Sequence, residues 1–211
     1  MWKIGFEFEF SFLEEQFIKP TNFIEKFVED KSCYIEAITY PVSLLSNCKK
    51  RDEIFDLIKS HSYLENPKIN KLCGGHITIS KLNLTGKELF IKFKKYIPII
   101  YSLCFKRLKY HACCNNLYLD KIGIKFAPMH AKKDLLEIRL FPMSKNIDEI
   151  FFRYKLINKI AEAIDKNLSY DKFLDTVKDL IDPVFINYSY HFKKMIKEKK
   201  RNKYVRNYLP R

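Results

Sequence analysis

Two acidic residues spaced two apart among aromatic residues are the first feature of this sequence that suits chemistry. Glu7 and Glu9 alternate with the phenylalanines of the segment 6–10. Because a strand places successive side chains on opposite faces, both carboxylates would point one way and the aromatic rings the other. A lone pair of this kind also occurs on ordinary solvated strands, so its meaning depends on its neighbours.

Three other segments alternate in the same way and carry polar residues at regular spacing. These residues are Glu36 in the run 33–41, His76 after Gly74–Gly75, and Glu137 and Arg139 in the run 136–140. An antiparallel sheet commonly packs one face and leaves the other polar. If the four segments are neighbours in one sheet, these glutamates converge with His76 and Arg139 on its polar face.

Four carboxylates in one place repel one another strongly unless they are protonated or bind cations. Carboxylate oxygens with one imidazole suit Mg²⁺ or Mn²⁺. The sequence therefore predicts a divalent-metal site whose ligands are Glu7, Glu9, Glu36, His76 and Glu137. Taken alone, His76 would more often be a hydrogen-bonded core histidine. Arg139, taken alone, could equally be a structural partner of the neighbours of Glu137, but in a site for metal and nucleotide its guanidinium group would bind phosphate oxygens.

Glycine is rare in this chain and lies close to the predicted ligands. The sequence has five glycines, and three of them are Gly5, Gly74 and Gly75. Glycine is the residue that tolerates close backbone approach and unusual dihedral angles at little cost. We therefore expect the backbone to pass close to other groups at these positions.

Helical periodicity marks most of the remaining chain. We expect helices over 23–28 and 54–58, and from Gly86 towards residue 108 with a kink or restart at Pro98. Asn146, Ser169 and the pair Asp182–Pro183 are typical starts of helices in the C-terminal third. The predicted class is α+β: a curved, mainly antiparallel sheet with helices on its convex face, a concave face that carries the site, and a helical C-terminal third.

Charge is unevenly distributed along the 211 residues, whose formal net charge is +14. The segment 193–211 holds nine lysines and arginines against the single acid Glu198. We expect one catalytic domain over 1–190 and a basic helix or tail over 191–211. This tail is either the solvated face of a terminal helix or a contact for a polyanion.

The cysteine spacing and the hydropathy pattern bear on the cellular compartment that we expect for this protein. The six cysteines lack paired CxxC spacing, and no apolar leader is evident. The most apolar stretch, residues 89–105, is interrupted by three lysines and Pro98, so we expect no membrane span. These features favour a cytoplasmic protein with reduced thiols.

Four motifs, taken in their order along the chain, resemble the amidoligase family. They are Gly5-Phe6-Glu7-Phe8-Glu9, Glu36 to Pro41, Cys73-Gly74-Gly75-His76 and Glu137-Ile138-Arg139. These are ATP-dependent carboxylate–amine ligases of the glutamine synthetase-like superfamily, and the likeness covers about residues 1–167. The resemblance implies a concave sheet face that binds Mg²⁺ ions and ATP, with the five metal residues above as ligands. It also implies that Glu137, His76 and Arg139 act in catalysis, and that Lys125 and Arg139 contact the nucleotide.

The resemblance implies a reaction in which ATP activates a carboxylate as an acyl phosphate, which an amine captures as an amide or isopeptide. The substrates would be an acid and an amine, including peptides or proteins. The absence of GxxxxGK[ST] and GxGxxG motifs leaves P-loop and Rossmann nucleotide sites unsupported.

Two other functions remain open from the sequence. A basic module without turnover would use the same fold to bind nucleic acid or an acidic protein. A zinc or thiol hydrolase would use Cys73 and His76, with a further group at His111, Cys113 and Cys114.

Overall fold

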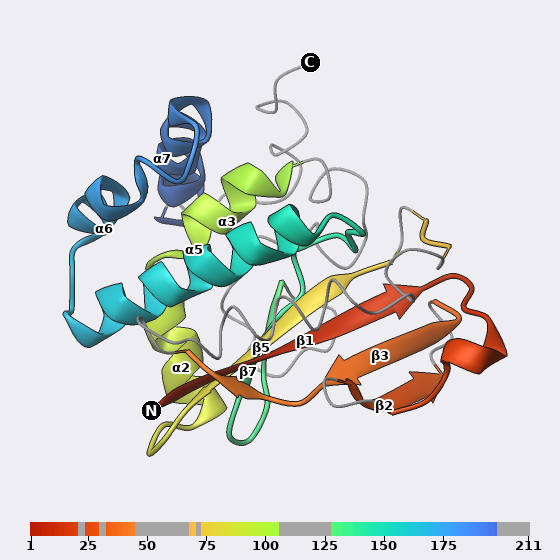
Figure 1. Ribbon diagram of the computed structural model, residues 1–211. Helices are drawn as coiled ribbons and strands as arrows, with labels where there is room; N and C mark the ends of the chain where they lie inside the picture. Colours follow the sequence, from red (N-terminus) through yellow and green to blue (C-terminus); the bar gives the residue numbers. More distant parts are fainter. Residues whose placement is uncertain (21–23, 30–32, 45–67, 71–72, 106–127, 198–211) are drawn as a thin grey trace.

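The centre of the fold is a sheet that is polar on one face and apolar on the other. The computed structural model describes residues 1–20, 24–29, 33–44, 68–70, 73–105 and 128–197. Within them, seven strands form a sheet in the order β2-β3-β1-β5-β7-β6, with β4 pairing with β1 (Figure 1). The strands are β1 (Trp2–Phe10), β2 (Ile24–Glu29), β3 (Ile35–Thr39), β4 (Val42–Ser43), β5 (Gly75–Lys81), β6 (Met129–Ala131) and β7 (Leu136–Ile138). All pairings are antiparallel, which confirms the expected α+β class.

Helices begin where the sequence places capping residues. They are α2 (Gly86–Phe93), α3 (Ile97–Leu103), α5 (Ile147–Asp165), α6 (Tyr170–Val177) and α7 (Pro183–Lys197), with a short 3-10 helix at Glu15–Phe17. Asn146 and Ser169 accept hydrogen bonds from backbone N–H groups at the starts of α5 and α6. The chain leaves α2 after Phe93 and restarts as α3 with Pro98 in its first turn, as proline predicts.

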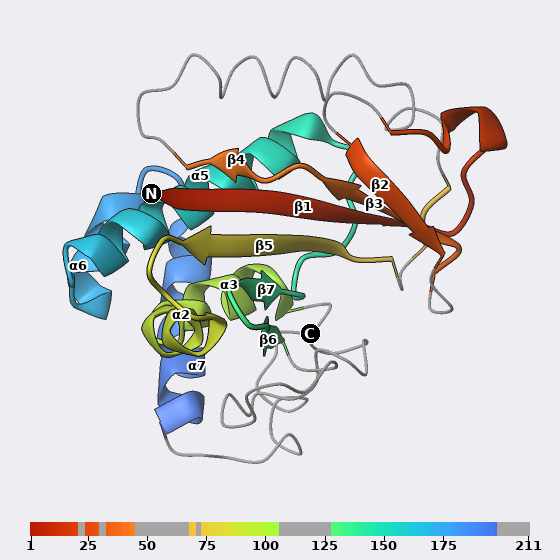
Figure 2. The ribbon, with the colours of Figure 1, turned by 90° about the horizontal axis from the view of Figure 1, so that it is seen from below.

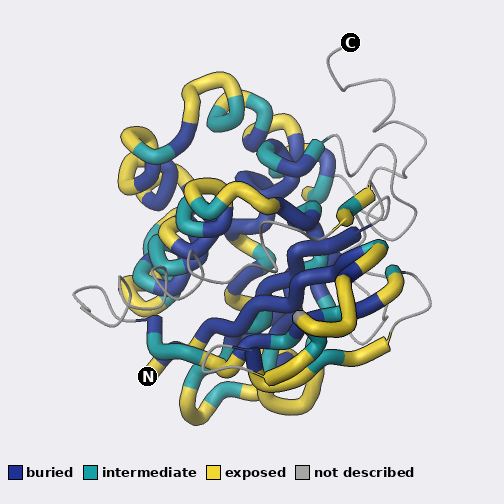
Figure 3. Tube along the Cα trace, turned by 45° about the vertical axis from the view of Figure 1, so that its right-hand side comes forward, coloured by how far each residue is buried: buried dark blue, intermediate teal, exposed yellow. Residues whose placement is uncertain are grey.

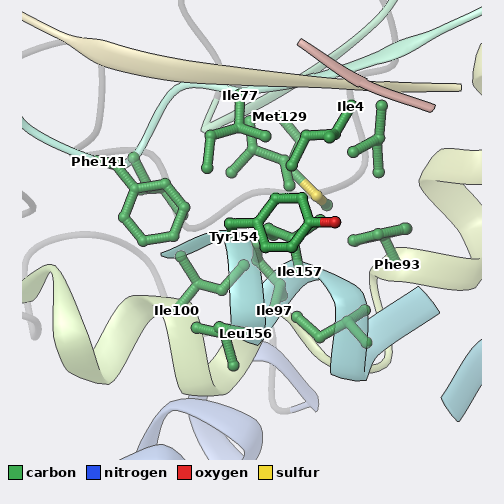
Figure 4. Packing of buried hydrophobic residues seen from close by; sticks show 14 of the residues in the cluster. Ile4, Ile77, Phe93, Ile97, Ile100, Met129, Phe141, Tyr154, Leu156 and Ile157 are labelled. Atoms are coloured by element: carbon green, nitrogen blue, oxygen red, sulfur yellow. The ribbon is translucent and has the colours of Figure 1, made fainter. Parts of the chain in front are cut away.

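The main core lies between the apolar sheet face and the helices. Helices α3 and α5 lie above the strands in Figure 1, and α5 passes behind them in Figure 2. In Figure 4, Ile4, Ile77 and Met129 of the sheet meet Phe93, Ile97, Ile100, Tyr154 and Ile157 of the helices. Burial follows this arrangement, with buried residues along the central strands and on the inner sides of the helices (Figure 3). Trp2 also donates a 2.9 Å hydrogen bond from Nε1 to Asp165 at the end of α5.

One predicted helix is wrong, because the segment from Ile24 is a strand. Strand β2 pairs with β3, and a bulge between Ile24 and Lys26 shifts the register. The extra residue brings Ile24 and Phe27, three positions apart, onto the same face as Thr39 and Ala37. Apolar residues three positions apart therefore share one face of this strand, as they would on a helix. The other short helix expected, over 54–58, lies outside the described residues.

The last described helix is continuous through the expected domain boundary. Helix α7 runs to Lys197 and packs on α3, with the rings of Phe192 and Tyr101 5.7 Å apart. The tail beyond it lies outside the described residues. Among the described helices, none has the combined length and apolarity needed to span a bilayer.

Candidate metal centre on the polar sheet face

Strand register gathers the predicted site residues on one face of the sheet. Glu7 of β1 lies directly opposite His76 of β5, and Glu9 lies opposite Glu36 of β3. Glu137 of β7 lies opposite Thr78, two residues along β5 from His76. Residues opposite each other in an antiparallel pair project from the same face. The apolar alternates, from Phe6 to Phe10, project into buried surroundings on the other side.

The His76 imidazole lies at the centre of the four glutamates. Its Nδ1 atom is 3.5 Å from Glu7 Oε2, 3.5 Å from Glu137 Oε1 and 4.0 Å from Glu36 Oε1. Its Nε2 atom is 3.3 Å from Glu9 Oε1. Four acidic side chains from three strands, β1, β3 and β7, thus converge on one imidazole ring, as the sequence predicted.

Three of these residues have ligand atoms close enough to share one ion. The group consists of Glu7, Glu36 and His76, and one ligand atom from each lies within 4.8 Å of the other two. The His76 side chain is 3% exposed, and its Nδ1 atom makes no hydrogen bond of good geometry in the described structure. A buried imidazole nitrogen that faces three carboxylates fits a divalent cation.

The two carboxyl groups of this triad have opposite pKa shifts. Burial and the negative charge of Glu7 raise the pKa of Glu36 to about 8. Burial also acts to raise the pKa of Glu7, but the His76 side chain and the Lys132 charge outweigh it and lower that pKa to about 2. At neutral pH without a metal, Glu36 therefore carries a proton and Glu7 is ionised, and a cation bound by both would displace that proton.

Glu137 lies between two cationic side chains. Arg139 pairs with its Oε1 atom, and Lys132 Nζ lies 2.9 Å from its Oε2 atom. Lys132 Nζ also lies 3.9 Å from Glu7 Oε1. Burial acts to lower the pKa of both basic groups, but the surrounding glutamates, Glu137 foremost, raise it instead. Both groups therefore stay charged beside the site.

Sequence reasoning missed two residues of this cluster, His130 and Lys132. His130 lies opposite Glu137 in the β6–β7 pair, with its Nδ1 atom 3.5 Å from Glu137 Oε2. Both residues belong to a short polar alternation, His130-Ala131-Lys132, which was overlooked because three residues are too few to mark a strand. Its position beside the Glu137-Ile138-Arg139 motif was the available signal.

The glycines near the site allow the close approach that their rarity predicted. A Cβ atom on Gly74 would overlap the His76 imidazole, and the Gly74 N–H group donates to Glu9 Oε2. A Cβ atom on Gly5 would lie 2.7 Å from Thr78 Oγ1. Gly74 therefore sets the position of two site residues through its missing side chain and its N–H group.

The remaining sequence predictions have mixed outcomes. The structure brings together Glu7, Glu9, Glu36, His76, Glu137 and Arg139, while their roles in metal binding and catalysis stay predictions. Lys125 lies outside the described residues, as do His111, Cys113 and Cys114. The Cys73 thiol contacts Asn70, with its Sγ atom 3.5 Å from the amide oxygen, while both His76 nitrogens face glutamates. These contacts disfavour a pair of Cys73 and His76 as nucleophile and base.

Comparisons with known proteins add no family to this description. No model of a protein family matches the chain, and a search of curated proteins finds no match.

Proposed function

We propose that this chain is a Mg²⁺- or Mn²⁺-dependent ligase that uses ATP to join a carboxylate to an amine, as in the amidoligase family. The observation that carries the proposal is the convergence of four glutamates on one buried imidazole, with Arg139 and Lys132 beside them. We further propose that the polar sheet face is the concave nucleotide-binding face of a glutamine synthetase-like fold. A cytoplasmic location is part of the same proposal.

The residues of the site have separate tasks in this proposal. Glu7, Glu36 and His76 hold the divalent ion, which when bound neutralises charge on the phosphate oxygens of ATP. Arg139 is oriented by its ion pair with Glu137. The Arg139 guanidinium group can also donate hydrogen bonds to phosphate oxygens of ATP, which stabilises the negative charge on the phosphoryl group during its transfer.

The proposed reaction has two steps, a phosphoryl transfer and then an acyl transfer. A substrate carboxylate oxygen attacks the γ-phosphorus of ATP, so an O–P bond forms and ADP leaves. The amine nitrogen then attacks the acyl carbon, phosphate leaves, and the nitrogen loses a proton as the amide forms. Because Glu7, Glu9, His76 and Glu137 are buried, the acyl phosphate would form where little water reaches it.

Trapping of the acyl phosphate is the direct test. The purified protein is incubated with MgATP, hydroxylamine and a panel of amino acids and peptides, and both ADP and hydroxamate are measured. The proposal expects equal amounts of ADP and hydroxamate with at least one acid, and neither product from the double variant with Glu7→Gln and Glu36→Gln. Absence of nucleotide binding by Mn²⁺-loaded protein would refute the ligase. Salt-sensitive nucleic-acid binding without ADP formation would instead favour the basic module.

A further inference from the structure

Lys132 is held next to the candidate metal triad by ordered backbone on both sides. It follows β6, and its N–H group donates to Leu135 O at 2.9 Å across the turn that leads to β7. The same turn is tied to the start of α2, where Gly86 N–H donates to Lys133 O at 3.0 Å. A Cβ atom on Gly86 would overlap Lys132 O, so the turn and α2 are in close contact. These backbone contacts therefore fix the position of the Lys132 main chain in the turn between β6 and β7.

The Lys132 ammonium group lies close to two carboxylates of the cluster. Nζ lies 2.9 Å from Glu137 Oε2 and 3.9 Å from Glu7 Oε1. With Arg139 on Oε1, both oxygens of Glu137 have a cationic partner. Glu137 Oε1 also lies 3.5 Å from His76 Nδ1, but the residues whose ligand atoms all lie within 4.8 Å of one another are Glu7, Glu36 and His76.

The balance of charge supports one divalent ion beside this lysine. Glu7, Glu9, Glu36 and Glu137 bring four negative charges when fully ionised, and Lys132 and Arg139 return two positive charges. A single divalent ion then makes the cluster neutral. A second divalent ion would leave two excess positive charges in a buried place, which is unfavourable unless an anionic ligand accompanies it.

We propose that Lys132 is a tethered cation in the place of a second divalent ion, so that the protein without nucleotide binds one divalent ion, at Glu7, Glu36 and His76. This inference rests on the proposed metal site but not on the ligase reaction. An ammonium group carries one charge and three donors on a flexible stem. The Lys132 side chain is 43% exposed, which leaves donors to contact an arriving anion such as a phosphate group.

Counting bound Mn²⁺ without nucleotide tests the inference. Calorimetry and the paramagnetic resonance of free Mn²⁺ at pH 8.5 are expected to show one ion on the wild-type protein. Lys132→Met removes the charge but keeps the length of the side chain. Glu137 Oε2 and Glu7 Oε1 then lose their ammonium partner, so the variant is expected to bind a second ion at these oxygens. Lys132→Arg keeps the charge and is expected to bind one ion. Lys133→Met is the matched control, since the exposed neighbour loses the same charge, and it is expected to bind one ion.

The outcomes separate this inference from the proposals on which it rests. Two ions on the wild-type protein, or one on Lys132→Met, would overturn the inference and leave the metal site standing. No bound Mn²⁺ on the wild-type protein would overturn both. One ion on the wild-type protein and two on Lys132→Met, without any ADP formation, would support the inference and refute the ligase.

A second measurement uses the wild-type protein, in case Lys132→Met does not fold. Amine acetylation of Lys132 relative to Lys133 is followed by mass spectrometry with and without Mn²⁺. A tethered lysine keeps its pairing with Glu137 after the ion binds, so the ratio is expected to stay constant. A severalfold rise in Lys132 labelling on addition of Mn²⁺ would show that the ion displaces the lysine, and would overturn the inference.

Discussion

Glu7 and His76 lie directly opposite each other on the antiparallel strands β1 and β5, and Glu7 Oε2 is 3.5 Å from His76 Nδ1. The pairing joins residues that are far apart in the sequence but adjacent in the sheet. Because β1 is central, its other neighbour β3 brings Glu36 to the same place. The metal-binding proposal depends on this three-strand arrangement.

Stability without metal is expected to fall as pH rises from about 4.5 to 8, through Glu36. Its pKa is raised to about 8 in the folded protein from an ordinary value of 4.5, so in this window the folded state keeps a proton that the unfolded state has lost. Glu36→Gln removes this loss. We expect the variant to gain about 4 kcal/mol in unfolding free energy, relative to the wild-type protein, between pH 5 and pH 9.

Urea denaturation in the presence of a chelator measures this difference. Glu29→Gln, at an exposed position of the edge strand β2, is the control and is expected to follow the wild-type curve. Glu7 contributes with the opposite sign, since its lowered pKa makes stability rise with pH between about 2 and 4.5. Parallel pH profiles for the wild-type protein and Glu36→Gln would show that burial does not raise the pKa of Glu36.

Mn²⁺ affinity is expected to rise with pH and to level off near pH 8. Below that pH the ion must displace the proton of Glu36, whose pKa is raised to about 8. One displaced proton makes the affinity rise about tenfold per pH unit. Titration calorimetry in buffers of different ionisation enthalpy counts the protons released. Release of about one proton at pH 6.5 and of none at pH 9 is the expected pattern, and constant affinity over this range would argue against Glu36 as a ligand.

Gly74→Ala is expected to weaken Mn²⁺ binding at least tenfold while the protein stays folded. The new methyl group would overlap the His76 imidazole, and that ring can move because it is a side chain. Displacement of His76 removes the only nitrogen ligand of the triad. Circular dichroism and Mn²⁺ titration measure the two effects separately.

Cys73→Ala is the matched control for that variant. Its thiol is buried and contacts Asn70, so we expect unchanged Mn²⁺ affinity and a small loss of stability. This control also tests the thiol hydrolase. Loss of a measured hydrolytic activity in Cys73→Ala, with Mn²⁺ binding intact, would revive that alternative.

Arg139→Met is expected to lower the affinity for an ATP analogue by about 10- to 100-fold, the effect of one lost charge-assisted hydrogen-bond group. Mn²⁺ binding should remain within a few-fold of the wild-type value, because Lys132 still neutralises Glu137. Arg139→Lys is expected to recover part of the nucleotide affinity through its charge. Equal nucleotide affinity in all three proteins would remove Arg139 from the phosphate site.

Much of the fold was predictable because its signals are local. The alternation of Glu7 and Glu9 with phenylalanines requires only that one strand has two unlike faces. Asn146 and Ser169 begin helices because their side chains accept hydrogen bonds from N–H groups two or three residues ahead. Pro98 restarts a helix through its own ring.

Features that depend on a partner strand were not predicted correctly from the sequence. The segment from Ile24 was predicted as a helix, because its period reflects a bulge that exists only when β2 pairs with β3. Lys132 and His130 were missed because nothing within three residues shows which carboxylate they face. Arg139 pairs with Glu137 from two residues away in the same segment, but Lys132 reaches Glu137 only across the turn between β6 and β7.

The sequence by itself determined which residues share a strand face and that the acidic ones need cations, since both follow from alternation and like-charge repulsion. Tertiary structure alone decided which of these acidic residues lie together as candidate metal ligands and which pair with cationic side chains. Strand order and register bring ligand atoms of Glu7, Glu36 and His76 within 4.8 Å of one another, and the turn between β6 and β7 brings Lys132 to Glu137. The physical reason is that charge interactions within a few ångströms depend on distances between strands, which no local pattern encodes.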